Sequence, residues 1–200
     1  MQKIYLCRHG ETDWSKSGRH TSFTDLELTK NGEKQANCLY RRIKDMSFDH
    51  VMISPLQRAR QTAELVQLKG EIEPDLFEWK YGEYEGLTTD QIQKLEPHWN
   101  VFTHGAKGGE SPKEVTQRAD RLIKKIRKLN GHIALFSSGH FTRAFAARWI
   151  GAPINMGQYL ALSTASLSIL GYEHDYPVIE CWNDISHYLK LGETHGKRAA

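Results

Sequence analysis

The sequence predicts an α/β fold, a three-layer sandwich with a mostly parallel central sheet flanked by helices. The alternation of two kinds of segment predicts this fold. Short apolar runs of strand length alternate along the chain with longer segments whose apolar residues recur at helical spacing. Such alternation is typical of parallel sheets that helices cover on both faces. The chain has 200 residues, of which 39% are hydrophobic and 26% charged, so one domain spanning residues 1–200 suits its length.

Five runs have the length and composition of strands. In chain order they are Lys3–Cys7, Val51–Ile53, His132–Phe136, Ser166–Leu170 and Val178–Trp182. The first three break off abruptly into polar residues, which indicates buried strands that end at a loop. A turn separates the last two.

Capping residues mark the helix starts. Thr29 precedes a segment in which apolar residues at 36, 39, 40 and 43 share one face. Two capping boxes have Pro at the first helical position: Ser54-Pro55-Leu56-Gln57, whose helix is expected to reach about Leu68, and Ser111-Pro112-Lys113-Glu114. We also expect a short helix over residues 88–95 and an apolar helix from residue 140 through 151.

The remaining segments read as loops. Residues 10–28 are polar and rich in Gly, Ser and Thr, which predicts a long loop. Residues 98–109 contain Trp99, Phe102, His104 and several glycines, and we expect an irregular lid there, within a lid-like insertion at about 87–110.

Composition excludes several classes of protein. The net charge of +3 is too small to indicate nucleic-acid binding, although it suits a small anionic substrate if the charge is focused in one cleft. Cys7, Cys38 and Cys181 are too widely spaced for a disulfide framework or a zinc site, and a reduced cytoplasmic location is expected. The N-terminal apolar run is too short for a signal peptide, and no stretch approaches transmembrane length, so no membrane partner is expected.

Candidate chemistry follows three of the expected strands. The first leads to Arg8 and His9, the second to Ser54 and Arg58, and the third to Ser138-Gly139-His140. In open parallel sheets, ligands bind beyond the carboxyl ends of the strands. We therefore expect these residues to converge at one edge of the sheet.

A phosphomonoester in that crevice would find suitable partners. A neutral imidazole such as His9 is a competent nucleophile toward phosphorus. Arg8 and Arg58 offer planar forks that match phosphoryl oxygens, and backbone N–H groups at Gly10 and at a helix start would add donors. A carboxylic acid must protonate the departing oxygen. Such a design needs neither a metal nor another cofactor.

Rival phosphatase designs fail on spacing. A cysteine-based phosphatase needs Arg six positions after its Cys, and the position six after Cys7 is Asp13. The run from Asp25 to Thr29 lacks the second Asp of an aspartyl phosphotransferase, and no Walker loop is present. No cluster has compact metal-ligand spacing.

Several motifs together resemble the histidine phosphatase superfamily, the phosphoglycerate mutase-like group. These are Arg8-His9-Gly10-Glu11-Thr12, the run from Ser54 to Thr62, the run from Glu78 to Gly86, and Gly109-Glu110-Ser111-Pro112. The likeness covers roughly residues 3–151. It implies an α/β sandwich, a phosphohistidine at His9, phosphate binding by Arg8 and Arg58, and proton donation by Glu78, with Glu83 and Glu85 as alternatives. The expected substrate contacts include Gly10, Tyr81, Ser138, Gly139 and His140.

Two positions depart from the family pattern. Its fourth block reads His-Gly after a strand, where this chain has Ser138-Gly139, with His140 following. A hydroxyl donates a hydrogen bond but carries no imidazolium charge, and the loss of one stabilising donor costs on the order of 10²–10³ in rate. Ser15 stands where mutases of the family carry Asn. Its surroundings resemble a phosphatase branch that includes sedoheptulose bisphosphatase, which adds Ser15, Arg19 and Thr21 as contacts for a sugar phosphate.

The leading hypothesis is therefore a metal-independent phosphomonoester hydrolase acting on a small phosphorylated metabolite. The alternatives are a phosphoglycerate mutase and a phosphate-binding pseudoenzyme weakened by Ser138. His9 must be neutral while Glu78 is protonated, which predicts an activity optimum at acidic to neutral pH. A late strand such as Val178–Trp182 would allow two copies to pair as a homodimer.

Overall fold

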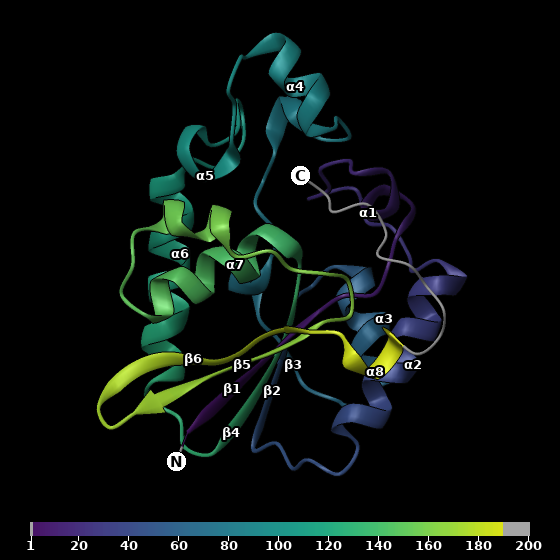
Figure 1. Ribbon diagram of the computed structural model, residues 1–200, viewed down its shortest axis with the longest axis vertical. Helices are drawn as coiled ribbons and strands as arrows, with labels where there is room; N and C mark the ends of the chain where they lie inside the picture. Colours follow the sequence, from purple (N-terminus) through teal and green to yellow (C-terminus); the bar gives the residue numbers. More distant parts are fainter. Residues whose placement is uncertain (1, 190–200) are drawn as a thin grey trace.

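The computed structural model describes residues 2–189 and is built on a six-stranded sheet of order β3-β2-β4-β1-β5-β6 (Figure 1). The strands are β1 (Lys3–Arg8), β2 (His50–Ile53), β3 (Glu71–Ile72), β4 (His132–Ser137), β5 (Leu167–Glu173) and β6 (Tyr176–Asp184). The four strands from β3 to β1 pair in parallel, and β5 and β6 join antiparallel at the far side. The α/β class and the mostly parallel sheet predicted from the sequence are confirmed.

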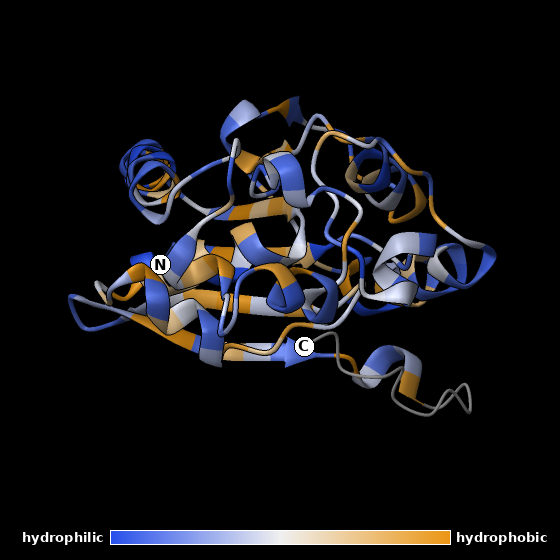
Figure 2. Ribbon diagram, turned by 90° about the horizontal axis from the view of Figure 1, so that it is seen from above, coloured by the Kyte–Doolittle hydropathy of each residue, from blue (hydrophilic) through white to orange (hydrophobic). Residues whose placement is uncertain are grey.

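Helices cover both faces of this sheet. The helices α2 (Lys30–Ile43) and α3 (Gln57–Leu65) bury apolar side chains against one face, where a core cluster contains Tyr5, Leu39 and Ala63. The helices α6 (Pro112–Ile126) and α7 (Gly139–Trp149) cover the other face, with a larger cluster that includes Leu6 and Leu122. Figure 2 shows apolar residues concentrated along the central strands between the helices.

The other elements are short. They are α1 (Asp13–Ser17), η1 (Pro74–Leu76), η2 (Gly82–Tyr84), α4 (Thr89–Leu95), α5 (Val101–His104), η3 (Ile154–Tyr159) and α8 (Ser186–Leu189). Figure 1 shows α4 and α5 beyond the end of the sheet at which β1 finishes. The expected irregular segment at 98–109 therefore contains a helical turn. Trp99 and Phe102 are buried there, each about 2% exposed or less, so this part of the insertion is firmly packed.

The capping residues predicted most helix starts. Thr29, Thr88 and Ser111 each accept a backbone N–H of the first turn of α2, α4 and α6. The box at Ser54 was wrong, because α3 begins at Gln57 and its N-cap is Leu56, which has no side-chain cap. The carboxylate of Asp25, from a distant loop, accepts the Gln57 N–H at 2.7 Å instead.

Two other expectations differ from the structure. Residues 10–28 are not loop throughout, since α1 forms within them, where Thr12 and Ser15 make a reciprocal capping box. The helix α3 ends at Leu65 and not near Leu68, and Val66 has left the helical conformation. Within residues 2–189, no helix has both the length and the apolar character needed to cross a membrane.

Candidate active site

The carboxyl ends of three parallel strands lie side by side at one edge of the sheet. The strand β4 lies between β2 and β1, and its Ser137 pairs with Arg8 while its Phe136 pairs with Ile53. The residues that follow these strands therefore meet, as the topology predicted. Their charges interact directly: Arg8, Arg58 and Glu78 each perturb the pKa of at least one of the others or of His9.

His9 is held in one tautomer. Its side chain is 4% exposed, and ring atom Nδ1 lies 2.7 Å from the carbonyl oxygen of Gly10. A carbonyl can only accept, so Nδ1 carries the proton and Nε2 keeps its lone pair. Burial lowers the pKa of His9 well below 6.5, and the nearby positive charges of Arg58 and Arg8 lower it further. The imidazole of His9 is therefore neutral, and its Nε2 atom carries no proton.

Gly10 has a structural role that the sequence did not indicate. A Cβ at this position would lie 2.5 Å from the carbonyl oxygen of Gly32 on α2, so the close approach of two backbones requires glycine. Its N–H donates to Thr62 Oγ1 at 3.0 Å. That N–H was expected to contribute to phosphate binding, but it is already occupied by the α3 side chain.

Both arginines are oriented by neutral acceptors. Arg8 Nη1 donates to the carbonyl of Leu162. Arg58 Nη2 and Nη1 donate to the carbonyls of Thr21 and Thr24, at 3.1 and 3.4 Å. The Nε atoms of both arginines are buried and have no hydrogen-bond partner among the described residues. Because no carboxylate within residues 2–189 pairs directly with either guanidinium, the charge of both groups remains available to an anion.

Glu85 holds the loop that orients Arg58. Its carboxylate accepts the N–H of Ser22 at 2.8 Å, the N–H of Thr24 at 3.0 Å and the Ser22 hydroxyl. These bonds fix the loop so that the carbonyls of Thr21 and Thr24 face the guanidinium. Glu83, in contrast, makes an exposed ion pair with Lys107.

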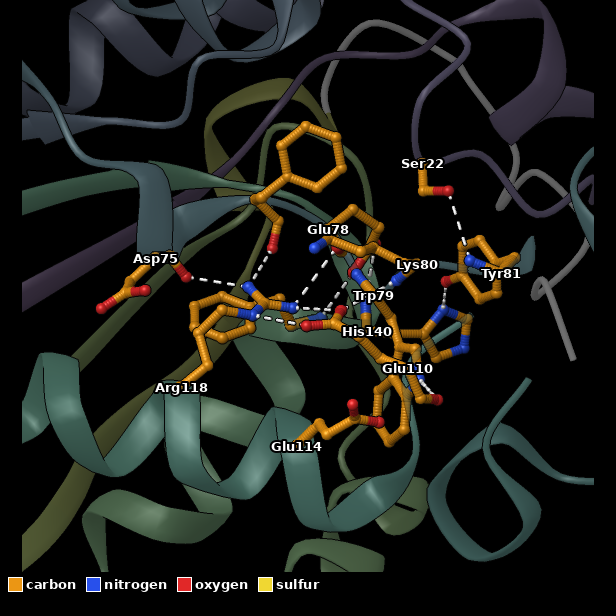
Figure 3. Close-up of polar contacts among 12 residues, drawn as sticks. Ser22, Asp75, Glu78, Trp79, Lys80, Tyr81, Glu110, Glu114, Arg118 and His140 are labelled. Atoms are coloured by element: carbon orange, nitrogen blue, oxygen red, sulfur yellow. Dashed lines mark hydrogen bonds and ion pairs between the residues drawn. The ribbon is translucent and has the colours of Figure 1, made fainter. Parts of the chain in front are cut away.

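The carboxylate of Glu78 is anchored at the start of α7 (Figure 3). Oε1 accepts the N–H groups of Trp79 and Phe141, at 2.8 and 2.7 Å, and Oε2 accepts that of His140 at 3.0 Å. The side chain is 4% exposed. Three backbone N–H groups therefore fix the position of both side-chain oxygens of Glu78 at the start of α7.

Ser138 stands beside this group as the N-cap of α7, with no side-chain cap bond. Its hydroxyl is buried and has no partner within residues 2–189. A Cβ at the next residue, Gly139, would lie 3.3 Å from Cζ of Arg8, so this turn packs directly against the Arg8 guanidinium. At the position where the family pattern has a second His, this chain therefore has a buried hydroxyl close to the positive charge of Arg8.

His140 faces away from the Glu78 carboxylate and contacts Tyr81. The Tyr81 hydroxyl lies 2.6 Å from Nδ1 of His140. Burial raises the pKa of Tyr81 well above 10 and lowers the pKa of His140 well below 6.5, so both groups are neutral. The phenol therefore donates to Nδ1, and Nε2 of His140 carries the remaining proton.

Known proteins of one family are similar to this chain along most of its length. The sequence profile of the histidine phosphatase superfamily (branch 1) matches residues 4–185. The chain belongs to the histidine phosphatase superfamily. An acid phosphatase of Mycobacterium tuberculosis is 43% identical over 86% of this chain and 87% of its own length. Sedoheptulose 1,7-bisphosphatase of Saccharomyces cerevisiae is 34% identical over 74% of this chain and 68% of its own. Membership of this family, together with these two relatives, identifies this histidine phosphatase as a phosphatase.

Solved structures share the fold. The product of an open reading frame of Mycobacterium tuberculosis superposes with a TM-score of 0.89 at 40% identity, over 91% of this chain and 97% of that one. A phosphoserine phosphatase of Entamoeba histolytica, in complex with 3-phosphoglyceric acid, gives a TM-score of 0.84 at 27% identity, over 94% and 100% of the two chains. The fold resemblance predicted from the motifs is confirmed.

Three residues predicted to contact a sugar phosphate, Ser15, Arg19 and Thr21, each have partners within the chain. Ser15 exchanges hydrogen bonds with Thr12 as a helix cap. Arg19 is exposed, and its guanidinium lies 5.9 Å from the centre of the Trp14 ring. The carbonyl oxygen of Thr21 accepts a hydrogen bond from Arg58. The hydroxyl of Thr21 donates to the carbonyl oxygen of Arg19. In the part of the chain that the structure describes, no three His, Cys, Asp or Glu side chains form a group suited to a metal ion.

Sequence reasoning missed two groups of supporting residues. Thr62 and Glu85 hold Gly10 and the Arg58 loop, and both fall inside the motifs, so their position was a usable signal. Arg118 and Glu110 form a buried ion pair beneath Glu78, at 2.8 Å. Their pairing joins a helix to a loop, and no local pattern indicated it.

Proposed function

We propose that the chain is a metal-independent phosphomonoester hydrolase that acts on a small phosphorylated metabolite through a phosphohistidine at His9. One observation carries the proposal. The bond from His9 Nδ1–H to Gly10 leaves Nε2 unprotonated, in a buried position next to two guanidinium groups. A nucleophile with a free lone pair and fixed positive charge beside it meets the needs of phosphoryl transfer.

The reaction follows in two steps. Nε2 of His9 attacks phosphorus, the bond to the leaving oxygen breaks, and that oxygen takes a proton from Glu78. Water then attacks the phosphohistidine, the phosphorus–nitrogen bond breaks, and Glu78 recovers a proton from the water. Arg8 and Arg58 bind the equatorial oxygens throughout. Among the described residues, Oε2 of Glu78 accepts one backbone hydrogen bond, from His140, so its second lone pair is the place for the proton.

The substrate class rests on relatives. Two relatives are, by their names, an acid phosphatase and a sedoheptulose 1,7-bisphosphatase. A fold neighbour was crystallised with 3-phosphoglyceric acid. Small phosphorylated metabolites, sugar phosphates among them, are therefore the compounds to test first.

Trapping the intermediate tests this proposal. Phosphohistidine is stable in alkali and labile in acid, so an alkaline quench during turnover of ³²P-labelled substrate retains the label on the protein. We expect a labelled wild type, and no label or phosphate release from the His9→Ala variant. Unchanged hydrolysis in His9→Ala would refute the mechanism.

A mutase is the second candidate, because a probable phosphoglycerate mutase of Photorhabdus laumondii is 30% identical over 94% of this chain. Parallel assays of phosphoglycerate isomerisation and of phosphate release separate the two activities. We expect release to exceed isomerisation. The opposite ratio would assign the chain to the mutases.

A further inference from the structure

Arg118 lies on α6, behind the segment that carries Glu78, and no step of the proposed reaction uses it (Figure 3). Its Nε and Nη2 donate to the two carboxylate oxygens of Glu110, at 3.0 and 2.8 Å. Its Nη1 donates to the carbonyls of Asp75 and Phe77, at 2.9 and 2.5 Å, and Nη2 donates to that of Glu78 at 3.4 Å. All five donors of the guanidinium thus have acceptors, and they fix the backbone path through Glu78.

The Arg118 guanidinium also contacts Phe141, the residue whose N–H binds the Glu78 carboxylate. It lies over the ring of Phe141, with Cζ 4.3 Å from the ring centre. The N–H of Phe141 donates to Oε1 of Glu78 at 2.7 Å. Arg118 therefore contacts both the backbone from which the Glu78 side chain extends and the residue whose amide holds its carboxylate.

Glu110 extends the support along the same segment. Its Oε2 accepts the N–H of Lys80 at 3.0 Å, and its own N–H donates to the Lys80 carbonyl at 2.8 Å. Its carbonyl accepts the indole N–H of Trp79 at 2.8 Å. Glu110 and Arg118 are 8% and 7% exposed. A buried ion pair contributes little net stability, because desolvation of the two charges offsets their attraction. An apolar pair of the same size could not orient these carbonyl groups, so orientation is what the ion pair contributes here.

We propose that Arg118, held by Glu110, is a positioning residue for the proton donor Glu78. This inference rests on the proposed function, since it needs Glu78 to protonate the leaving oxygen. Its consequence concerns leaving groups. A dinitrophenolate leaves without a proton, whereas an alkoxide must be protonated as the bond breaks. Misplacing Glu78 therefore slows hydrolysis of an alkyl phosphate and spares that of dinitrophenyl phosphate.

The test compares kcat/KM of Arg118→Met on glycerol phosphate and on dinitrophenyl phosphate. A general acid contributes on the order of 10²–10⁴, so we expect a loss of about tenfold or more on glycerol phosphate and less than about threefold on dinitrophenyl phosphate. In a Glu78→Gln background, Arg118→Met should cost less than about threefold on either substrate, because the group it positions is already disabled.

Arg121→Met is the matched control. Arg121 lies one turn further along α6 and contacts the same segment, but through the Asp75 carboxylate, at 2.8 and 2.6 Å, and it is largely exposed. Both activities of this variant should match the wild type. If Arg118→Met does not fold, Glu110→Gln is judged by the same criteria, since it removes the charge that holds Arg118 while keeping the shape.

The outcomes separate the two proposals. Equal losses on both substrates overturn the positioning role, as does a full additional loss in the Glu78→Gln background. If the wild type is labelled at His9 while the Arg118 variant slows both substrates equally, only the positioning role fails. If no phosphohistidine forms in the wild type, the proposed function itself fails.

Discussion

Oε1 of Glu78 lies 2.7 Å from the backbone nitrogen of Phe141, so a carboxylate from the segment before η2 is tied to the first turn of α7. His140 contributes a second N–H to the same carboxylate, and Ser138 and Gly139 form the turn immediately before it. The proposed proton donor and the position where the family pattern has a second His are therefore parts of one turn, next to Arg8.

Replacing Ser138 by His should raise activity. An imidazolium in this turn would add a charged donor to the phosphoryl group, where the buried Ser138 hydroxyl has no hydrogen-bond partner among the described residues. We expect kcat/KM to increase by about tenfold or more, in line with the cost of one missing donor. Ser138→Ala is the control and should lose activity modestly. A silent wild type with an active Ser138→His variant would indicate a disabled, phosphate-binding form, and no gain in Ser138→His would show that another group already fills this role.

Removing the Glu85 carboxylate should weaken phosphate binding. In Glu85→Ala the loop at Thr21 and Thr24 loses its anchor, and the Arg58 guanidinium loses its orientation. We expect kcat/KM to fall by on the order of tenfold on alkyl and dinitrophenyl phosphates alike, and inhibition by vanadate to weaken. Glu83→Ala, which breaks only an exposed pair with Lys107, should behave as wild type. A loss confined to alkyl phosphates would contradict this role.

His9 should remain an active nucleophile in moderate acid. Its pKa lies well below 6.5 because the ring is buried beside two positive charges, so the neutral form persists as the pH falls past that value. We expect kcat/KM at about pH 5.5 to be at least equal to that at pH 7.5, because the imidazole stays neutral over this range. The measurement is a pH–rate profile on dinitrophenyl and glycerol phosphates. An acid limb near pH 6.5 on both substrates would show that His9 titrates as a solvent-exposed imidazole.

Acid should nevertheless destabilise the fold. Burial lowers the pKa of His20 from 6.5 to about 4, partly offset by Glu85. Between these values the unfolded chain binds a proton that the folded chain does not, so the free energy of unfolding falls as the pH is lowered through this window. The contribution of His20 is on the order of 3 kcal/mol. Urea unfolding at pH 7 and 4 should show this loss, and His20→Gln should reduce it. An identical pH dependence in the variant would rule out His20 as its source.

Chelation should leave turnover unchanged. The proposed reaction places all positive charge on Arg8 and Arg58, so it needs no ion at the phosphoryl group. Phosphate release after dialysis against EDTA should equal that of the untreated protein, and added Mg²⁺ or Zn²⁺ should not raise it. A loss restored by one of these ions would require a metal in the mechanism.

The sequence predicted the sheet and the meeting of the strand ends because both depend on local signals. The apolar runs at β1, β2 and β4 are unmistakable, and the caps at Thr29 and Ser111 depend on neighbours within three residues. The start of α3 was misjudged because the acceptor for Gln57 N–H is Asp25, which folding alone brings there. For the same reason the support of Glu78 by Arg118 and Glu110 had no signature in the chain.

The order of strands has a consequence for how this protein is made. The strand β1, which leads to His9, precedes strands β2 to β6 in the chain, yet Lys3 pairs with His132 and Ile4 with Leu170, which lie 129 and 166 residues later. On the ribosome its apolar side chains have no neighbouring strand until β4 emerges, and the second edge is closed only after β5. Such distant pairings fold slowly and leave the early strand open to aggregation or chaperone capture. His9, the proposed nucleophile, therefore follows a strand that acquires its sheet neighbours only when residues more than 120 positions later have been made.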